Sequence, residues 1–293
     1  MEATLEAPRR HKPFYNGFYA FPEAAGGFCV PPETRDFLEE LLVSTGDWAA
    51  NSVATRAERL DVEGAGKVEN GRTIPGEALS ELYREATELS VFGVPLPKKH
   101  GGLETPASAS LIGLAQMARG CIASSTQIAF FTSIGEMLHR FADEETAERL
   151  IPKIIAGEIS GSMCLTEPGC GSDLGSIITS ATPQDDGTYL INGSKIFITN
   201  GGGGIGLVLA RIKGAPEGSK GITLFLVPKF IHDETGKLLN QNNVTSVSME
   251  KKLGLHGLPT MVLEYAKSVA WLIGKENQGL TAMFTMMNNA RLG

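Results

Sequence analysis

Hydrophobic residues in the first half of the chain recur at intervals of three and four positions. Phe37, Leu38, Leu41 and Leu42 form the first such group, and this spacing puts them on one face of an amphipathic helix. The same spacing predicts three further helices, over residues 77–89, 107–118 and 124–141. The first half of the chain is therefore expected to be helical.

Local signals set the ends of the neighbouring elements. Asp143 is followed by two acidic residues, which predicts the N-cap and first turn of another helix. Pro152 is expected to interrupt that helix, and Gly157 to end it. Residues 64–76 are polar and rich in glycine, and they predict a loop.

Beyond Ile159 apolar and polar residues alternate, so the hydrophobic period changes from 3.6 to two. The pattern predicts strands over residues 160–166, 176–182, 188–199, 205–212, 220–228, 244–250 and 260–273, the last as two strands. The sequence Asp185-Asp186-Gly187 is a hairpin turn signal between two of them. Because helices come first and strands second, the pattern favours an α+β fold over alternating βαβ units.

This change of period suggests a division of the chain. An irregular, proline-rich arm (1–32) precedes a helical domain (33–159) and a β domain (160–273). Residues 274–293 resume a helical pattern, with Leu280, Met283, Phe284 and Met287 as the apolar stripe.

Composition and charge restrict the class of protein. The chain has 293 residues, 42% of them hydrophobic, enough for one sizeable core or two modest ones. A formal net charge of −7 argues against a nucleic-acid partner. The most apolar long window, residues 108–138, contains charged and amide side chains, so we expect no membrane span. Cys29, Cys121, Cys164 and Cys170 show no CxxC spacing, which predicts reduced thiols in a cytoplasmic protein.

The most informative stretch runs from Met163 to Ser172 and reads MCLTEPGCGS. It begins with strand alternation and breaks at Glu167-Pro168-Gly169. Gly169 and Gly171 lack a Cβ, so their amides can approach a ligand closely and can take positive φ. A strand that ends in such a turn suits an anionic cofactor such as a dinucleotide. An ordinary turn after an edge strand is the alternative.

A second stretch, residues 195–199, carries an aromatic ring and a hydroxyl on one side. Alternation puts Phe197 and Thr199 on one face of the predicted strand, and Ile196 and Ile198 on the other. Such a face can lie against a flavin, with the ring packed on the isoalloxazine. A strand with a solvent-facing threonine is the alternative.

These two stretches, in this order and spacing, resemble the paired flavin-binding signatures of the acyl-CoA dehydrogenase family. Further segments are similar to the family in the same order: 93–102, 220–228, 252–257, 271–280 and 288–293. The similarity runs from about Phe37 to the last residue. The residues around Phe197 and those at 283–287 are most similar to the long-form branch of the family. Phe197 stands where the family usually has tryptophan.

The resemblance implies a fold and an activity. It implies an N-terminal helical bundle followed by an antiparallel β-sandwich or barrel, with the family's C-terminal four-helix domain truncated. It also implies FAD as cofactor, an acyl-CoA substrate, α,β-dehydrogenation and electron transfer to an electron-transfer flavoprotein, in a homo- or hetero-oligomer. A fragment or subunit that binds FAD and acyl-CoA but needs a partner for its base is the alternative. A DNA-associated relative fits the acidic charge poorly.

The resemblance also implies site residues. Those expected to hold FAD are Met163, Cys164, Leu165, Thr166, Glu167, Pro168, Gly169, Cys170, Gly171, Ser172, Phe197, Ile198 and Thr199. Those expected to contact the CoA moiety are Ser172, Asn288 and Arg291. The family's catalytic glutamate lies beyond Gly293, and Glu167 belongs to the flavin loop, so the sequence predicts no catalytic residue.

Overall fold

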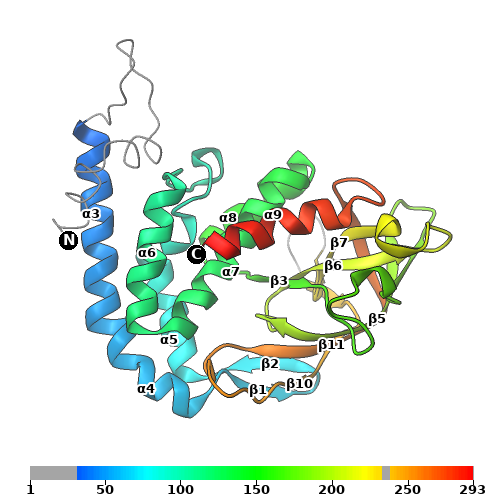
Figure 1. The fold of residues 1–293 in the computed structure, drawn as a ribbon, viewed down its shortest axis with the longest axis horizontal. Coiled ribbons are helices and arrows are strands. Elements are labelled where there is room, and N and C mark those ends of the chain that lie inside the picture. Colours follow the sequence, from blue (N-terminus) through cyan, green and yellow to red (C-terminus); the bar gives the residue numbers. More distant parts are fainter. Residues whose placement is uncertain (1–31, 233–237, 293) are drawn as a thin grey trace, which may run out of the picture.

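The computed structural model describes residues 32–232 and 238–292. Its first part is a helical bundle, on the left of Figure 1. The α-helices are α3 (Pro32–Trp48), α4 (Ala54–Glu63), α5 (Glu77–Glu88), α6 (Ala107–Gly120), α7 (Ile122–Phe141) and α8 (Glu144–Ile155). One π-helical turn, Ala49–Val53, joins α3 to α4, and short 3₁₀ turns cover Val91–Gly93 and Lys98–His100. The four predicted helical ranges are thus confirmed, whereas the predicted arm, apart from Pro32, lies outside the described residues.

The sequence predictions for the two ends of α8 were correct, but the predicted interruption within it was not. Asp143 is the N-cap: its Oδ1 accepts a hydrogen bond of 2.8 Å from the Thr146 amide. The prediction that Pro152 interrupts the helix was wrong, because α8 continues to Ile155. Pro152 is exposed, so water can bond the carbonyl that loses its partner. After the helix Gly157 takes a φ of +69° and completes a C-terminal cap.

The predicted loop at residues 64–76 is a β-hairpin. Strands β1 (Gly66–Glu69) and β2 (Arg72–Pro75) pair antiparallel. Asn70 and Gly71 both have positive φ, at 50° and 73°, as a two-residue type I′ turn requires. The Asn-Gly dipeptide was therefore a readable signal for this hairpin.

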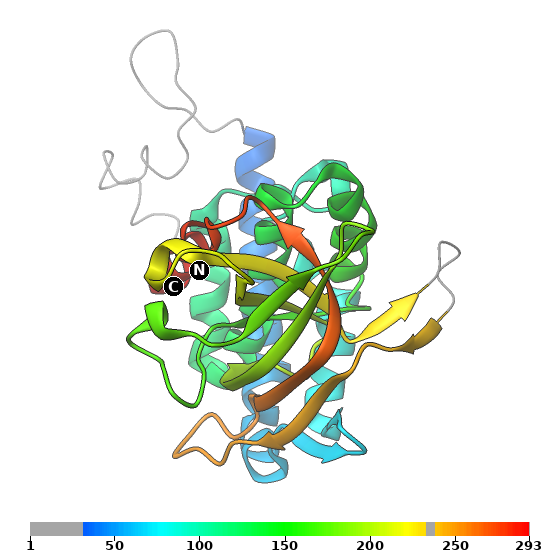
Figure 2. The same cartoon turned by 90° about the vertical axis from the view of Figure 1, so that its right-hand side faces the viewer.

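The second half of the chain is built around a closed β-barrel, which faces the viewer in Figure 2. Its strands are β4 (Ser180–Pro183), β5 (Tyr189–Thr199), β6 (Ile205–Ile212), β7 (Ile222–Pro228) and β11 (Thr260–Ile273). They pair in the order β11-β5-β4-β6-β7, and β7 pairs again with β11 to close the ring. The edge strands β3 (Gly161–Cys164) and β10 (Val244–Met249) pair with β6 and β11. A separate hairpin joins β8 (Phe230–His232) to β9 (Leu238–Gln241).

Three details of the barrel differ from the sequence prediction. The strand predicted over residues 176–182 begins only at Ser180. Residues 260–273 form one continuous strand, not two, with a bulge between Ala266 and Ser268. The first strand ends at Cys164 instead of continuing to residue 166. The predicted turn at Asp185–Gly187 is present, and Gly187 has a φ of +81°.

Two apolar cores hold these parts together. One fills the barrel, and the other runs through the helical bundle onto the outer faces of β6 and β7. Helix α9 (Gly279–Leu292) packs on β7 and α7, as Figure 1 shows. Ala282, Met283 and Met286 are its buried residues, whereas Phe284, expected on the buried stripe, is 47% exposed.

Candidate functional site

The two sequence stretches singled out above lie side by side. The Ile196 amide of β5 donates a hydrogen bond of 2.9 Å to the Thr166 carbonyl, just past the end of β3. Beyond Thr166 the chain folds into a tight turn. Glu167 and Cys170 exchange two backbone hydrogen bonds, of 2.9 and 3.1 Å. The turn that carries Pro168 and Gly169 is therefore attached directly to β5.

A buried ion pair anchors this turn. Lys195 Nζ lies 2.8 Å from Glu167 Oε1, and the two side chains are 0% and 2% exposed. The same ammonium donates a bond of 2.9 Å to the Leu165 carbonyl. The amides of Ile178 and Thr179 donate to the two carboxylate oxygens at 2.8 and 3.1 Å. Glu167 thus ties the turn to β5 and to the segment before β4.

This environment determines the charge of Glu167. Burial alone would raise the pKa of the carboxyl, but the Lys195 ammonium and the two amides outweigh it, and the net pKa lies below 4.5. The carboxylate is ionised and fully engaged. It is therefore not a free base, as the sequence analysis had inferred from its place in the flavin loop.

The glycines of the turn leave open space. A Cβ added at Gly169 would meet no atom within 4 Å, and one at Gly171 would meet only Thr166 Cγ2, at 3.5 Å. Neither residue has positive φ, so conformational freedom is not what requires glycine here. Within the described parts of the chain, the amides of Gly169, Gly171 and Ser172 donate to no acceptor. The turn therefore has open space at Gly169 and amides without an internal acceptor.

Phe197 is displayed by a bulge in β5. The pairing with β11 steps from Ile198–Met261 to Lys195–Leu263, which leaves one extra residue on β5. Phe197 has a φ of +57° and is 59% exposed, whereas Ile198 is buried. The simple alternation that the sequence predicted is therefore broken, although Phe197 still leaves the core. Thr199 is partly exposed and is the last residue of β5, paired with Thr260.

The residues expected to contact CoA fall in two places. Ser172 is exposed at the end of the turn, beside a surface hollow of about 470 Å³ that Asp173, Arg211 and Glu217 help to line. The Arg211 guanidinium is held by the Gly175, Pro216 and Gly218 carbonyls. Asn288 is exposed on α9, and the Arg291 side chain lies outside the described residues. Helix α9 packs on β7 and α7, away from the turn and β5.

The structure also brings in residues that sequence reasoning did not select. Lys195 was read only as the start of a motif, yet it neutralises Glu167. Gln127 of α7 donates from Nε2 to Asn200 Oδ1 at 2.6 Å, next to Thr199. Because α7 also carries serines, threonines and charged side chains, no sequence signal singled out Gln127.

Comparison with known families assigns both parts of the chain. The N-terminal domain model of acyl-CoA dehydrogenases matches residues 35–158, and the middle domain model matches residues 162–268. The chain belongs to the acyl-CoA dehydrogenase family. It is 37% identical over 269 residues to 3-methylmercaptopropionyl-CoA dehydrogenase of Ruegeria pomeroyi. The aligned region covers 88% of this chain and 44% of that protein. The chain thus spans less than half the length of this relative.

Solved structures share the fold. Butyryl-CoA dehydrogenase from Megasphaera elsdenii superposes with a TM-score of 0.73 at 25% identity, over 87% of this chain and 63% of that one. An acyl-CoA dehydrogenase from Bacillus anthracis, solved with FAD, superposes with the same score at 24% identity. That match covers 90% of this chain and 42% of the other. The predicted order of a helical bundle and then a β domain is thereby confirmed.

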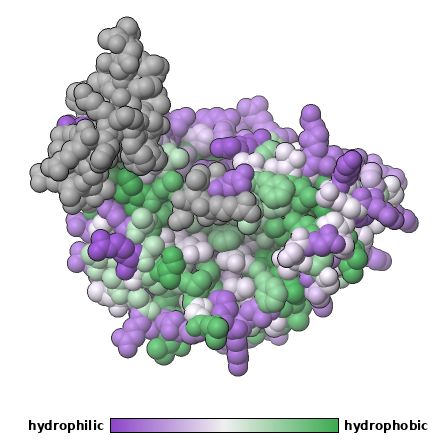
Figure 3. All heavy atoms as spheres, in the orientation of Figure 1, coloured by the Kyte–Doolittle hydropathy of each residue, from purple (hydrophilic) through white to green (hydrophobic). Residues whose placement is uncertain are grey.

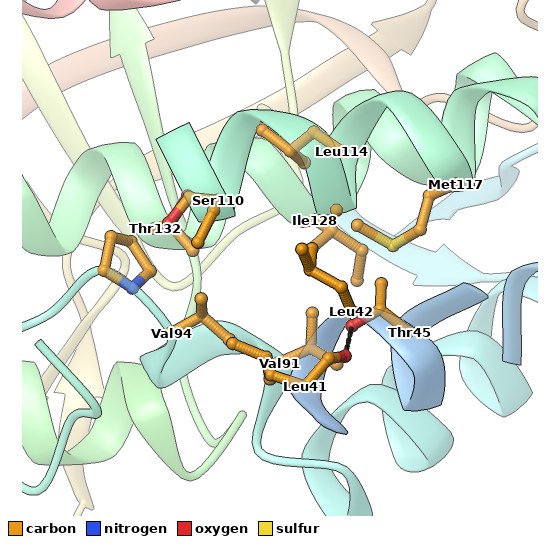
Figure 4. Close-up of a pocket in the computed structure, with 13 residues that line it drawn as sticks. Leu41, Leu42, Thr45, Val91, Val94, Ser110, Leu114, Met117, Ile128 and Thr132 are labelled. Atoms are coloured by element: carbon orange, nitrogen blue, oxygen red, sulfur yellow. Dashed lines mark hydrogen bonds between the residues drawn. The ribbon is translucent and has the colours of Figure 1, made fainter. Parts of the chain in front are cut away.

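Other features of the chain lie away from the turn. A cavity of about 30 Å³ sits in the helical bundle, between α3, α6 and α7 (Figure 4), and Thr45, Ser110 and Thr132 are its hydroxyl-bearing residues. Thr45 Oγ1 donates to the Leu41 carbonyl at 2.8 Å, so this hydroxyl is already used. The space is about that of one water molecule.

Two further classes of site were tested over the described residues. In that part of the chain no group of three or more His, Cys, Asp or Glu side chains could hold a metal ion. No helix there has the length and hydropathy needed to span a membrane. Cys121, Cys164 and Cys170 are free thiols, as predicted, and Cys29 lies outside the described residues.

Proposed function

We propose that this chain forms the flavin-binding part of an FAD-dependent acyl-CoA dehydrogenase. The reaction would be α,β-dehydrogenation of an acyl-CoA thioester, with electrons passed on to an electron-transfer flavoprotein. The observation that carries the proposal is the hydrogen bond that attaches the Met163–Ser172 segment, with its unpartnered amides, to the strand that carries the exposed Phe197 ring. Family membership and the sequence resemblance supply the identity of the cofactor and of the substrate.

The residues present fit a flavin. The open space at Gly169 admits a ligand to the backbone, and the free amides of Gly169, Gly171 and Ser172 can donate to its polar groups. The exposed Phe197 ring offers a stacking surface, and the Thr199 hydroxyl can donate or accept beside it. FAD, when bound, would supply the hydride-accepting chemistry. Glu167 and Lys195 would act by keeping the turn in place.

Substrate contacts follow from the same arrangement. Ser172 and the hollow beside it would receive part of the CoA moiety, and Asn288 and Arg291 of α9 would contact another part. We assign no catalytic base, because the carboxylate of Glu167 is neutralised by Lys195. The division into a helical domain (33–159), a β domain (160–273) and the start of a further helical domain (274–293) is part of this proposal. So are a cytoplasmic location and an oligomeric assembly.

A second candidate is a binding platform without its own base. In this case the chain would hold FAD and acyl-CoA, and a partner polypeptide would supply the carboxylate. The neutralised Glu167 leaves the turn without a free carboxylate, which is what this candidate requires.

The test is the visible absorption spectrum of the purified chain with FAD, before and after anaerobic addition of acyl-CoAs of several lengths. A protein-bound flavin band that an acyl-CoA bleaches would support the dehydrogenase. A bound band that no acyl-CoA bleaches would favour the platform. Absence of bound flavin after reconstitution with FAD would contradict both. Free FAD with the same acyl-CoAs is the control for non-enzymatic bleaching.

A further inference from the structure

We infer that Gln127 is a positioning residue that fixes the flavin-facing end of β5 against helix α7. The inference rests on the proposed function for its consequence, namely cofactor binding, but the contact itself belongs to this chain. Gln127 is completely buried, and Asn200, its partner, is 2% exposed. Gln127 Nε2 donates to Asn200 Oδ1 at 2.6 Å. Asn200 directly follows Thr199, and Phe197 lies three residues before it.

The hydrogen bonds around Asn200 determine how the two amides are oriented. Asn200 Nδ2 donates to the Gly161 carbonyl at 2.7 Å, and a carbonyl can only accept. The other atom of the Asn200 amide, Oδ1, must therefore be the acceptor that faces α7. Gln127 consequently offers its nitrogen, and its Oε1 remains buried without a partner in the described residues. If Gln127 only filled space, an apolar side chain of the same size would be more favourable, because the unpaired buried Oε1 costs free energy.

Asn200 gathers several segments at this point. Its amide donates to the Pro259 carbonyl at 2.7 Å, next to the start of β11, and its carbonyl accepts from the Gly203 amide at 2.9 Å. Its φ is +54°, a conformation that asparagine tolerates better than most residues. The bond from Gln127 is thus made to the residue that sets where β5 ends.

Helix α7 approaches the β domain closely along this same face. Ile134 lies seven residues after Gln127, two helical turns along the same face. A Cβ on Gly161 would meet Ile134 Cγ2 at 2.8 Å, so the start of β3 is pressed against α7. Apolar packing at Ile134 sets the distance between helix and strand, and the directional bond at Gln127 sets the register. We infer from this geometry that contacts with α7 fix the orientation of the end of β5, which carries Phe197 and Thr199.

The test compares Gln127→Met with the wild-type chain by amide hydrogen exchange without added FAD. Methionine has nearly the same volume but leaves Asn200 Oδ1 unpaired. We expect exchange at the Asn200, Gly201 and Gly203 amides to accelerate about tenfold, the factor given by one hydrogen bond of ordinary strength. The Gly274 amide, which donates to the Phe141 carbonyl at the far end of α7, should not change. Gln116→Met is the matched control, because Gln116 lies on α6 and its Oε1 is also buried and unpaired.

A second variant separates hydrogen bonding from packing. In Gln127→Glu the neutral acid can donate to Asn200 Oδ1, whereas the ionised carboxylate cannot. Protection of the strand end should match the wild type at low pH and fall as the buried carboxyl ionises. A role limited to filling space would give no such pH dependence. This variant also serves if Gln127→Met does not fold.

A second measurement is FAD binding, in which FAD is titrated into the same proteins and the flavin fluorescence is followed. If the wild type binds FAD, Gln127→Met should bind about tenfold more weakly, and Gln116→Met should match the wild type. Unchanged exchange at Asn200, Gly201 and Gly203, or equal acceleration at Gly274, would overturn the inference. Equal FAD affinity of Gln127→Met and wild type would do the same. A wild type that binds no FAD would contradict the proposed function, while the exchange data would still decide the positioning role.

Discussion

The ammonium of Lys195 and the carboxylate of Glu167 lie 2.8 Å apart in a place that water does not reach. Two ions in such a site are stable only because every charge has partners: the Leu165 carbonyl for the ammonium, and the Ile178 and Thr179 amides for the carboxylate. The pair joins the two sequence motifs, whose members lie 28 positions apart in the chain. It is the main polar tie between the turn and β5.

Removing one member of the pair should be far more damaging than removing both. Lys195→Met leaves a buried, unpaired carboxylate, and we expect a loss of about 3–5 kcal/mol in the free energy of unfolding. The double variant Lys195→Met, Glu167→Gln has no buried charge and should recover a large part of that loss. Urea denaturation of the two variants measures the difference. Equal losses in the single and double variants would contradict this account of the pair.

The same pair predicts loss of stability in acid. The folded-state pKa of Glu167 lies below its ordinary value of 4.5, because the Lys195 ammonium and the amides outweigh the effect of burial. Its contribution is therefore present above about pH 4.5, the unfolded-state value, and is lost as the pH falls through the folded-state pKa. The urea midpoint should fall over this acid range. The fall should be smaller in the double variant, which lacks the titrating carboxylate.

A histidine links the β domain to helix α4 with the opposite pH dependence. His256 Nδ1 lies 2.8 Å from Asp61 Oδ1, and Nε2 lies 2.9 Å from the Lys252 carbonyl. Both partners are acceptors, so only the imidazolium form can donate from both ring nitrogens. The bond to Asp61, followed by that to Lys252, raises the pKa of His256 above 6.5.

The contribution of this contact to stability is present below about pH 6.5 and is lost as the pH rises through the folded-state pKa. An NMR titration of the imidazole should show a midpoint above 6.5. Asp61→Asn should move that midpoint back toward 6.5. An unchanged midpoint in Asp61→Asn would show that Asp61 is not the cause.

The exposed ring of Phe197 predicts a variant that affects FAD more than folding. Phe197→Leu removes an aromatic surface that is 59% exposed, so the free energy of unfolding should change little. Loss of stacking should weaken FAD binding by about 0.5–1.5 kcal/mol, up to about tenfold. Phe197→Trp should keep the affinity. Fluorescence titration measures the FAD affinity of both Phe197 variants. Phe284→Leu on α9 is the control at another exposed phenylalanine.

Apolar side chains are exposed on part of the surface. In the orientation of Figure 3, apolar side chains gather in the middle of the face, and hydrophilic side chains line much of the rim. Phe197 and Ile178, which are 59% and 85% exposed, belong to the segments that Glu167 ties together. A cofactor bound at the turn would cover part of such exposed apolar surface.

The sequence by itself determined the class of each element and the two stretches that form the site. Hydrophobic periodicity is a local property, so most helices of the first half and strands β3 to β7, β10 and β11 could be read from it. Helix α4 and the β8-β9 hairpin were not predicted. The signals at Asp143 and Gly187 also act within a few residues, and both were correct. The error at Pro152 arose because its exposure was not yet known. The hairpin at Asn70-Gly71 was missed although its turn signal is local.

The tertiary structure alone decided the electrostatics and the fine geometry of the site. Nothing local to Lys195 indicates that its ammonium is buried, because its partner Glu167 is distant in sequence. The bulge at Phe197 depends on the register with β11, and the role of Gln127 depends on how α7 docks on the barrel. Burial, pairing and register are properties of two segments at once, and a periodic pattern in one segment cannot specify them.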